Sequence, residues 1–91
     1  MRPQRQAVVY SRAGCHLCEQ LIEELLPLVR GRWQVEVIDI DANADLVSNY
    51  NDRVPVLEVD GNMVCQWRLD RSAVDRILLA ESAADGASPQ A

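Results

Sequence analysis

The residues with the clearest chemical potential are Cys15 and Cys18, which are separated by His16 and Leu17. They follow a short apolar run and a loop, and they open a segment of helical periodicity. Three residues of helix advance about 4.5 Å and turn through almost a full revolution, so both sulfurs project on one side at a separation that a disulfide requires. The unpaired N–H groups and the positive dipole end of a helix start stabilise a thiolate there. The pattern predicts reversible thiol–disulfide chemistry.

The positions of the two cysteines predict different roles. Cys15 lies nearer the helix end and the loop, so we expect it to be the exposed nucleophile. Cys18 lies one turn inside, so we expect a shielded resolving thiol. Arg12, three residues upstream, is expected to add positive potential beside the thiolate. His16 has two interpretations that remain open: a cation that raises oxidising power, or a solvent-exposed spacer.

Other uses of a cysteine pair require more ligands than these residues supply. Glu19 rather than His follows Cys18, so the haem-attachment signature is absent. Structural zinc takes four ligands, and iron–sulfur centres take several thiolates, so we expect no metal site. Two alternatives to an enzyme remain: a metal, iron–sulfur or glutathione-binding carrier that uses Cys15, and a non-catalytic adapter.

The third cysteine, Cys65, lies far along the chain from the pair. Strand alternation predicts that it shares a face with Met63 and Trp67. A buried, inert Cys65 is one expectation, because cysteine packs well as a small hydrophobe. An exposed thiol that exchanges with the pair or is glutathionylated is the other. Trp67 and Trp33 are expected to be packing or rim residues.

Hydropathy patterns predict the element order β-α-β-α-β-β-α. The expected strands are 7–10, 33–40, 54–59 and 62–67. The first helix begins at Cys15, carries an apolar stripe of Leu17, Leu21, Leu25 and Leu28, stops near Gly31, and is expected to kink or end early at Pro27. A short helix capped by Asp41 or Asn43 is expected to bury Leu46, Val47 and Tyr50, and a last helix follows Asp70 with Val74, Ile77 and Leu78 inward.

These elements predict an α/β fold with a mixed four-stranded sheet and helices on its faces. The first two strands flank a helix and are expected to be parallel, whereas Asp60-Gly61 predicts a tight antiparallel hairpin between the last two. We expect one domain over 1–80, with its core at about 7–79. The segment 81–91 is small, polar and aperiodic, which predicts a flexible tail.

Composition excludes several classes of function. The 91 residues carry nine Lys plus Arg against fourteen Asp plus Glu, a net charge of −5, which argues against nucleic-acid or anionic-membrane partners. No apolar run approaches the roughly 20 residues of a membrane span, and no signal peptide is visible. Three cysteines are too few for a secreted disulfide scaffold. We therefore expect a cytoplasmic monomer.

The stretch Tyr10-Ser11-Arg12-Ala13-Gly14-Cys15-His16-Leu17-Cys18 resembles the glutaredoxin branch of the thioredoxin fold, and short bacterial single-domain members most of all. Asp39-Ile40-Asp41-Ala42 and Arg53-Val54-Pro55-Val56 fit the same resemblance, which spans about 7–79. It implies a small thiol–disulfide oxidoreductase with protein disulfides, glutathione or both as partners. It implies no bound cofactor, with glutathione as a co-substrate.

The resemblance also implies roles outside the cysteine pair. Pro55 is expected to be cis and to face Cys15, with the Val54 backbone free to pair with an extended substrate. This chain departs from typical glutaredoxins in His16-Leu17 between the cysteines, in Arg53 before Val-Pro, and in lacking a Gly-Gly pair after the last strand. Asp70 has two interpretations, contact with a glutathione-like amine and a helix N-cap. Dithiol exchange is expected to survive these departures, while the recycling partner, glutathione or a thioredoxin-type reductase, stays open.

Overall fold

The computed structural model describes residues 4–87, and their side chains as far as Glu81. The elements follow the expected order: β1 (Arg5–Ser11), α1 (His16–Val29), β2 (Trp33–Asp39), a 3-10 turn η1 (Ile40–Ala42), α2 (Ala44–Tyr50), β3 (Val56–Val59), β4 (Asn62–Gln66) and α3 (Arg71–Ala87). The expected strands were correct in number and place within this range, and their ends differ from the expected ones by at most two residues.

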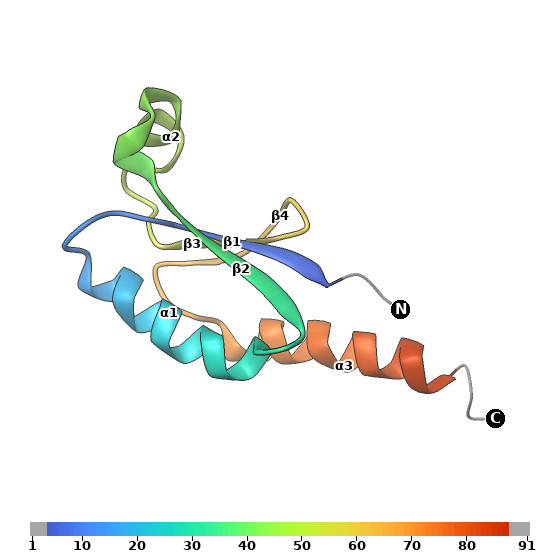
Figure 1. Ribbon diagram of the computed structural model, residues 1–91. Coiled ribbons are helices and arrows are strands. Elements are labelled where there is room, and N and C mark those ends of the chain that lie inside the picture. Colours follow the sequence, from blue (N-terminus) through green and yellow to red (C-terminus); the bar gives the residue numbers. More distant parts are fainter. Residues whose placement is uncertain (1–3, 88–91) are drawn as a thin grey trace.

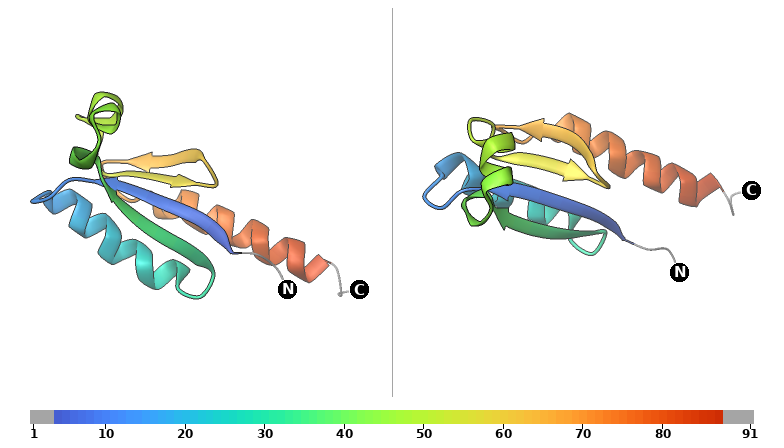
Figure 2. Two further views of the ribbon diagram at one scale, coloured as in Figure 1. Left: turned by 45° about the horizontal axis from the view of Figure 1, so that its top comes forward. Right: turned by 90° about the horizontal axis from the view of Figure 1, so that it is seen from above.

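The four strands form one mixed sheet in the order β2-β1-β3-β4. β1 and β2 are parallel, with Ala7 opposite Val35, while β3 is antiparallel to both β1 and β4. Helices α1 and α3 cover one face of the sheet, and α2 lies on the opposite side, near the carboxyl ends of β1 and β2 (Figures 1 and 2). This is the predicted α/β architecture, and it places the β1–α1 loop at one end of the sheet.

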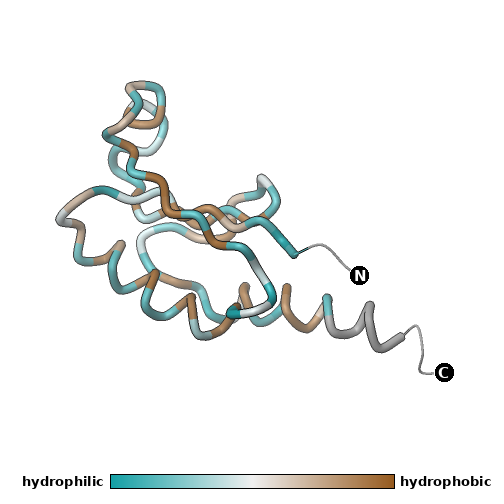
Figure 3. The backbone as a smooth tube through the Cα atoms, in the orientation of Figure 1, coloured by the Kyte–Doolittle hydropathy of each residue, from teal (hydrophilic) through white to brown (hydrophobic). Residues whose placement is uncertain are grey.

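The core lies between the sheet and the two long helices. Because the chain has no Phe, aliphatic side chains fill this layer, and each fully buried one contributes about 1.5–3 kcal/mol relative to exposure. Figure 3 shows apolar residues concentrated in the strands and recurring along α1. The side chains that are less than 2% exposed in this cluster are Ala7, Val9, Leu21, Leu25, Val29, Leu57 and Val74.

Helix α1 passes through Pro27 and continues to Val29. Of the two expected effects of Pro27, a kink or an early end, the early end was therefore wrong. Proline removes one N–H donor near the end of the helix, and the buried Val29, 1% exposed, anchors the last turn to the core. Gly31 adopts a φ of +78° just after the helix, as the predicted stop requires.

The hairpin between β3 and β4 turns at Asp60-Gly61, whose φ angles of +52° and +86° match the predicted type I′ geometry. The register shifts inside the hairpin: Leu57 pairs with Cys65, but Glu58 pairs with Met63. Val64 is thus an extra residue, a β-bulge. The bulge reverses the alternation, so Cys65 is buried while Met63 is 52% exposed. The expectation that these two share a face was wrong.

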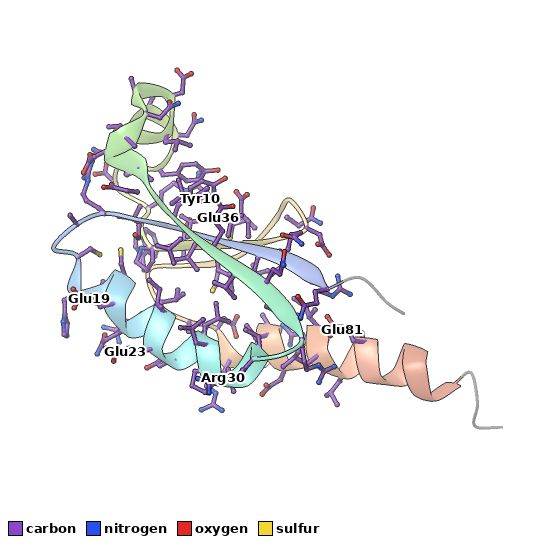
Figure 4. All side chains as sticks on the ribbon, viewed as in Figure 1. Tyr10, Glu19, Glu23, Arg30, Glu36 and Glu81 are labelled. Carbon is purple, nitrogen blue, oxygen red and sulfur yellow. The ribbon has the colours of Figure 1, made fainter. Side chains whose placement is uncertain are left out.

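Helix α3 extends well past the expected end of the domain, through Ala87. Glu81, assigned to a flexible tail by its sequence context, is only 8% exposed. Its carboxylate accepts hydrogen bonds from Trp33 Nε1 (2.9 Å) and Arg32 (3.2 Å), and it also pairs with Arg5. Figure 4 shows Glu81 on α3 beside the start of β2. The boundary at 81 is therefore corrected, and positions 88–91 lie outside the described residues.

Helix α2 is short and sits on the sheet without deep burial. Asn43 caps it by accepting from the backbone N–H groups of Asp45 (2.8 Å) and Leu46 (3.3 Å), which selects one of the two predicted caps. Leu46, Val47 and Tyr50 are half-buried rather than buried. A seven-residue helix has too little surface to enclose them.

Candidate active site

The turn between β1 and α1 presents Cys15 at the first position before the helix. Gly14 adopts a φ of +78°, a conformation that glycine reaches without steric cost. The Cys15 N–H closes this turn by donating to the Arg12 carbonyl at 3.2 Å. Cys15 then acts as the N-cap of α1, and its Sγ accepts from the Cys18 N–H at 3.2 Å. A sulfur in this position receives one of the free N–H donors at the start of the helix.

Cys18 occupies a different environment, one turn into α1. Cys18 is 2% exposed, whereas Cys15 is half-buried, and neither forms a disulfide. Burial, together with a hydrogen bond to Cys15 and against a smaller lowering by the Arg12 backbone, raises the pKa of the Cys18 thiol to about 12. The pair thus combines an accessible sulfur at a helix start with a shielded thiol that holds its proton.

The Arg12 guanidinium does not stand free beside the cysteines. Its Nε and NH2 groups form hydrogen bonds to both carboxylate oxygens of Asp41, at 3.1 and 3.0 Å. This bidentate pair raises the pKa of Arg12. Because Asp41 largely cancels the positive charge, the expected contribution of this side chain to the potential at Cys15 is reduced. The partner lies 29 residues away, on η1, so only the fold could reveal it.

The other charged side chains near the helix start point to solvent. His16 is exposed, in line with the spacer interpretation, and Glu19 is also exposed. Figure 4 shows Glu19 and Glu23 on the first turns of α1. Both carboxylates are exposed, so they place negative charge on the solvent-facing side of the first turns of α1.

The segment that leads into β3 contains Arg53, Val54 and Pro55. The Val54–Pro55 peptide bond is cis, Val54 is half-buried and Pro55 is buried. Arg53 donates from Nε to Gln66 Oε1 at 3.1 Å and lies 5.5 Å from the ring centre of Tyr50. These contacts fix the Arg53 side chain beside Val54.

Tyr50 is itself held in place by two contacts that the sequence did not predict. Its ring stacks on Tyr10 with centroids 4.3 Å apart, and its hydroxyl donates to Glu58 at 2.9 Å. Burial raises the pKa of Tyr50 to about 12, with the Glu58 carboxylate adding to the effect. The stack joins α2 to β1 and supports the segment that carries Arg53.

The segment after β4 contains the two remaining residues of interest. Asp70 caps α3, because its Oδ1 accepts from the Ala73 N–H at 3.1 Å, as the N-cap interpretation predicted. Cys65 is 7% exposed, and burial raises the pKa of its thiol, in agreement with the inert interpretation. Trp33 is a core residue at 4% exposure, whereas Trp67 is 50% exposed.

Trp67 makes more contacts near this site than its predicted role as a packing or rim residue implied. Its backbone N–H donates to the Pro55 carbonyl at 2.7 Å, and its Nε1 donates to the Asp52 carbonyl at 2.9 Å. It therefore joins the end of β4 to the segment that carries the cis bond. The available signal was its place in the segment where glutaredoxins have Gly-Gly.

Two kinds of feature are absent from the described residues. Between residues 4 and 87, no group of three His, Cys, Asp or Glu side chains is arranged to hold a metal ion. Within that same range no helix is both long and apolar enough to cross a bilayer.

The mixed sheet and the cysteine pair at the start of the first helix combine an α/β fold with a candidate thiol site. The family model of the glutaredoxin-like domain matches residues 6–79. The chain belongs to this glutaredoxin-like family.

Several known proteins are similar to this chain in sequence or in fold. An uncharacterised protein of Mycobacterium tuberculosis is 32% identical in an alignment of 71 residues that covers 71% of this chain and 73% of the relative. A protein of Nitrosomonas europaea, solved by NMR in solution, is 40% identical over 85% of this chain and 94% of its own, with a TM-score of 0.74. A protein of X. campestris, solved by X-ray methods, is 35% identical over 81% and 96%, with a TM-score of 0.65.

Proposed function

We propose that this protein is a dithiol oxidoreductase in which Cys15 is the nucleophile and Cys18 the resolving thiol. The observation that carries the proposal is the 3.2 Å hydrogen bond from the Cys18 N–H to Cys15 Sγ, together with the burial of Cys18. A helix-start sulfur that accepts an N–H bond is prepared to be a thiolate, and the thiolate is the attacking species. The glutaredoxin-like family and fold support thiol redox chemistry in general.

The reaction consists of two successive thiol–disulfide exchanges. The Cys15 thiolate attacks one sulfur of a substrate disulfide, the substrate S–S bond breaks, and the departing sulfur leaves as a thiolate that takes a proton from water. Cys18 then loses its proton and attacks the Cys15 sulfur, which releases the second substrate thiolate. The substrate gains two electrons and two protons, and the enzyme pair becomes the Cys15–Cys18 disulfide. A thiol reductant, either glutathione or a thioredoxin-type reductase, restores the dithiol.

The substrates that we propose are protein disulfides, with glutathione as a possible co-substrate rather than a bound cofactor. We propose that the protein works as a monomer in the cytoplasm. Its acidic surface supports the expectation that nucleic acids are not partners.

Turnover with a small neutral disulfide tests the proposal. Reduction of 2-hydroxyethyl disulfide is followed with glutathione or a thioredoxin-type reductase as the electron source. We expect Cys15→Ser to abolish turnover and Cys65→Ser, the control for loss of a cysteine outside the pair, to leave it within twofold. Turnover by Cys15→Ser at the wild-type rate would refute the assigned role.

A further inference from the structure

Trp67 has a backbone conformation that bulky residues rarely adopt. Its φ is +68°, in the left-handed region that favours glycine. Strain of this kind persists where surrounding contacts impose it, and it clusters at functional sites. The contacts here are the two hydrogen bonds to the carbonyls of Pro55 and Asp52. They use both N–H donors of the residue, so the indole is fixed while half of the residue stays exposed to water.

A cavity lies between this indole and helix α1. Its volume is about 240 Å³, and its walls include Leu17, Glu24, Trp67 and Arg68. Leu17 is one of the two residues between the cysteines, so one wall of the cavity is part of the cysteine motif itself. Small-molecule sites usually measure about 300–1,000 Å³, which makes this cavity better suited to one large side chain than to a whole ligand.

The walls of the cavity supply groups that a peptide would use. Arg68 and Glu24 are exposed, and among residues 4–81 no side chain pairs with either of them. Arg68 offers N–H donors to a peptide carbonyl, and Glu24 offers an acceptor to a peptide N–H. Leu17 and the ring of Trp67 offer apolar and aromatic surface to a side chain.

We propose that this cavity is a specificity subsite that accepts an aromatic side chain of a polypeptide disulfide near its reacting cysteine. The inference rests on the proposed function, because the subsite binds the part of the substrate next to the cysteine whose disulfide Cys15 attacks. During that attack one S–S bond forms to Cys15, the substrate S–S bond breaks, and the leaving thiolate is protonated by water. Glutathione has no apolar side chain to place against Trp67, so the subsite favours protein disulfides over glutathione disulfide.

Matched peptides test the subsite. Each is a disulfide-bonded peptide with Tyr or Ala at one of the three positions on either side of a cysteine, and the readout is the ratio of kcat/KM for Tyr over Ala. We expect wild type to favour Tyr by about tenfold at one or two positions, with equal rates elsewhere. Equal rates at every position would overturn the proposal.

Two variants separate the indole from the backbone. Trp67→Gly removes the ring, and glycine adopts a φ of +68° without strain, so the hydrogen bond to Pro55 is retained. We expect the Tyr-to-Ala ratio to fall to about one in this variant, whatever its absolute rate. Trp67→Phe keeps an aromatic face and should keep most of the preference. If Trp67→Gly kept the wild-type ratio of kcat/KM for the Tyr peptide over the Ala peptide, the proposed subsite would be refuted. A wild-type protein that fails to reduce even 2-hydroxyethyl disulfide would instead refute the underlying function.

Discussion

The asymmetry between the two active-site thiols leads to a quantitative prediction about alkylation. With a pKa of about 12, about one Cys18 in 10⁴ is a thiolate at pH 8, against about one in ten for a thiol whose pKa is 9.0. A more basic thiolate is a better nucleophile, with a Brønsted slope of about 0.4–0.5. This higher reactivity offsets the lower thiolate fraction by a factor of about 20. We therefore expect iodoacetamide to modify Cys18 about fiftyfold more slowly than an ordinary thiol at pH 8.

The assay is a time course of alkylation on reduced protein, with each cysteine peptide quantified by mass spectrometry. The rate at Cys18 should rise about tenfold per pH unit from pH 8 to 10, because a raised pKa keeps the thiol protonated through this range. Denatured protein is the control, in which all three cysteines should react alike. Cys15→Ala removes the sulfur that accepts from Cys18, and the Cys18 rate should increase yet stay below that of the denatured chain, because burial is the larger cause.

Two results would refute this reasoning. If Cys18 in the folded protein reacted at pH 8 as fast as in the denatured chain, the thiol would not be shielded as its burial indicates. If its rate reached a plateau near pH 9, the pKa would be that of an ordinary thiol, and the division of roles between Cys15 and Cys18 would lose its electrostatic basis.

Three further predictions concern groups around the site and the fold. Glu81→Ala should lower the free energy of unfolding in urea by about 2–3 kcal/mol, mostly because the buried Trp33 Nε1 loses its charged acceptor; a loss below about 0.5 kcal/mol would contradict this. Gly14→Ala should cost about 1 kcal/mol from the positive φ alone, since nothing lies within 4 Å of an added Cβ, and a much larger fall in thermal stability would indicate a contact not described above. Asp41→Asn should free Arg12 and raise kcat/KM for anionic oxidised glutathione several-fold at low salt while lowering it for cationic cystamine; equal changes for both disulfides would exclude an electrostatic cause.

Local sequence signals predicted most of the architecture. The change from period 2 to period 3.6 after Gly14 located β1 and α1, and Asp60-Gly61 set the hairpin. The same signals placed Cys15 at a helix start, which is the main element of the site. These features depend on residues near one another in the chain, so a single sequence contains them.

The features that the sequence did not predict depend on long-range contacts. The pairing of Arg12 with Asp41 and the clamp on Glu81 join residues that only the folded sheet brings together. The bulge at Val64 shifts a register without leaving a composition signal, and it reversed the expected face of Cys65. Trp67 is held in a left-handed backbone conformation, against its own local preference, by hydrogen bonds that it donates to carbonyls of another segment.

Capture of the covalent intermediate tests the central claim most directly. The Cys18→Ser, Cys65→Ser double variant is incubated with oxidised glutathione or with a disulfide-bonded peptide, and its intact mass is measured before and after reduction. We expect one mixed disulfide per chain, mapped to Cys15 and removed by dithiothreitol. A variant that stays unmodified with both probes, while its Cys15 thiol is shown to be reduced, would contradict the assignment of Cys15 as the nucleophile.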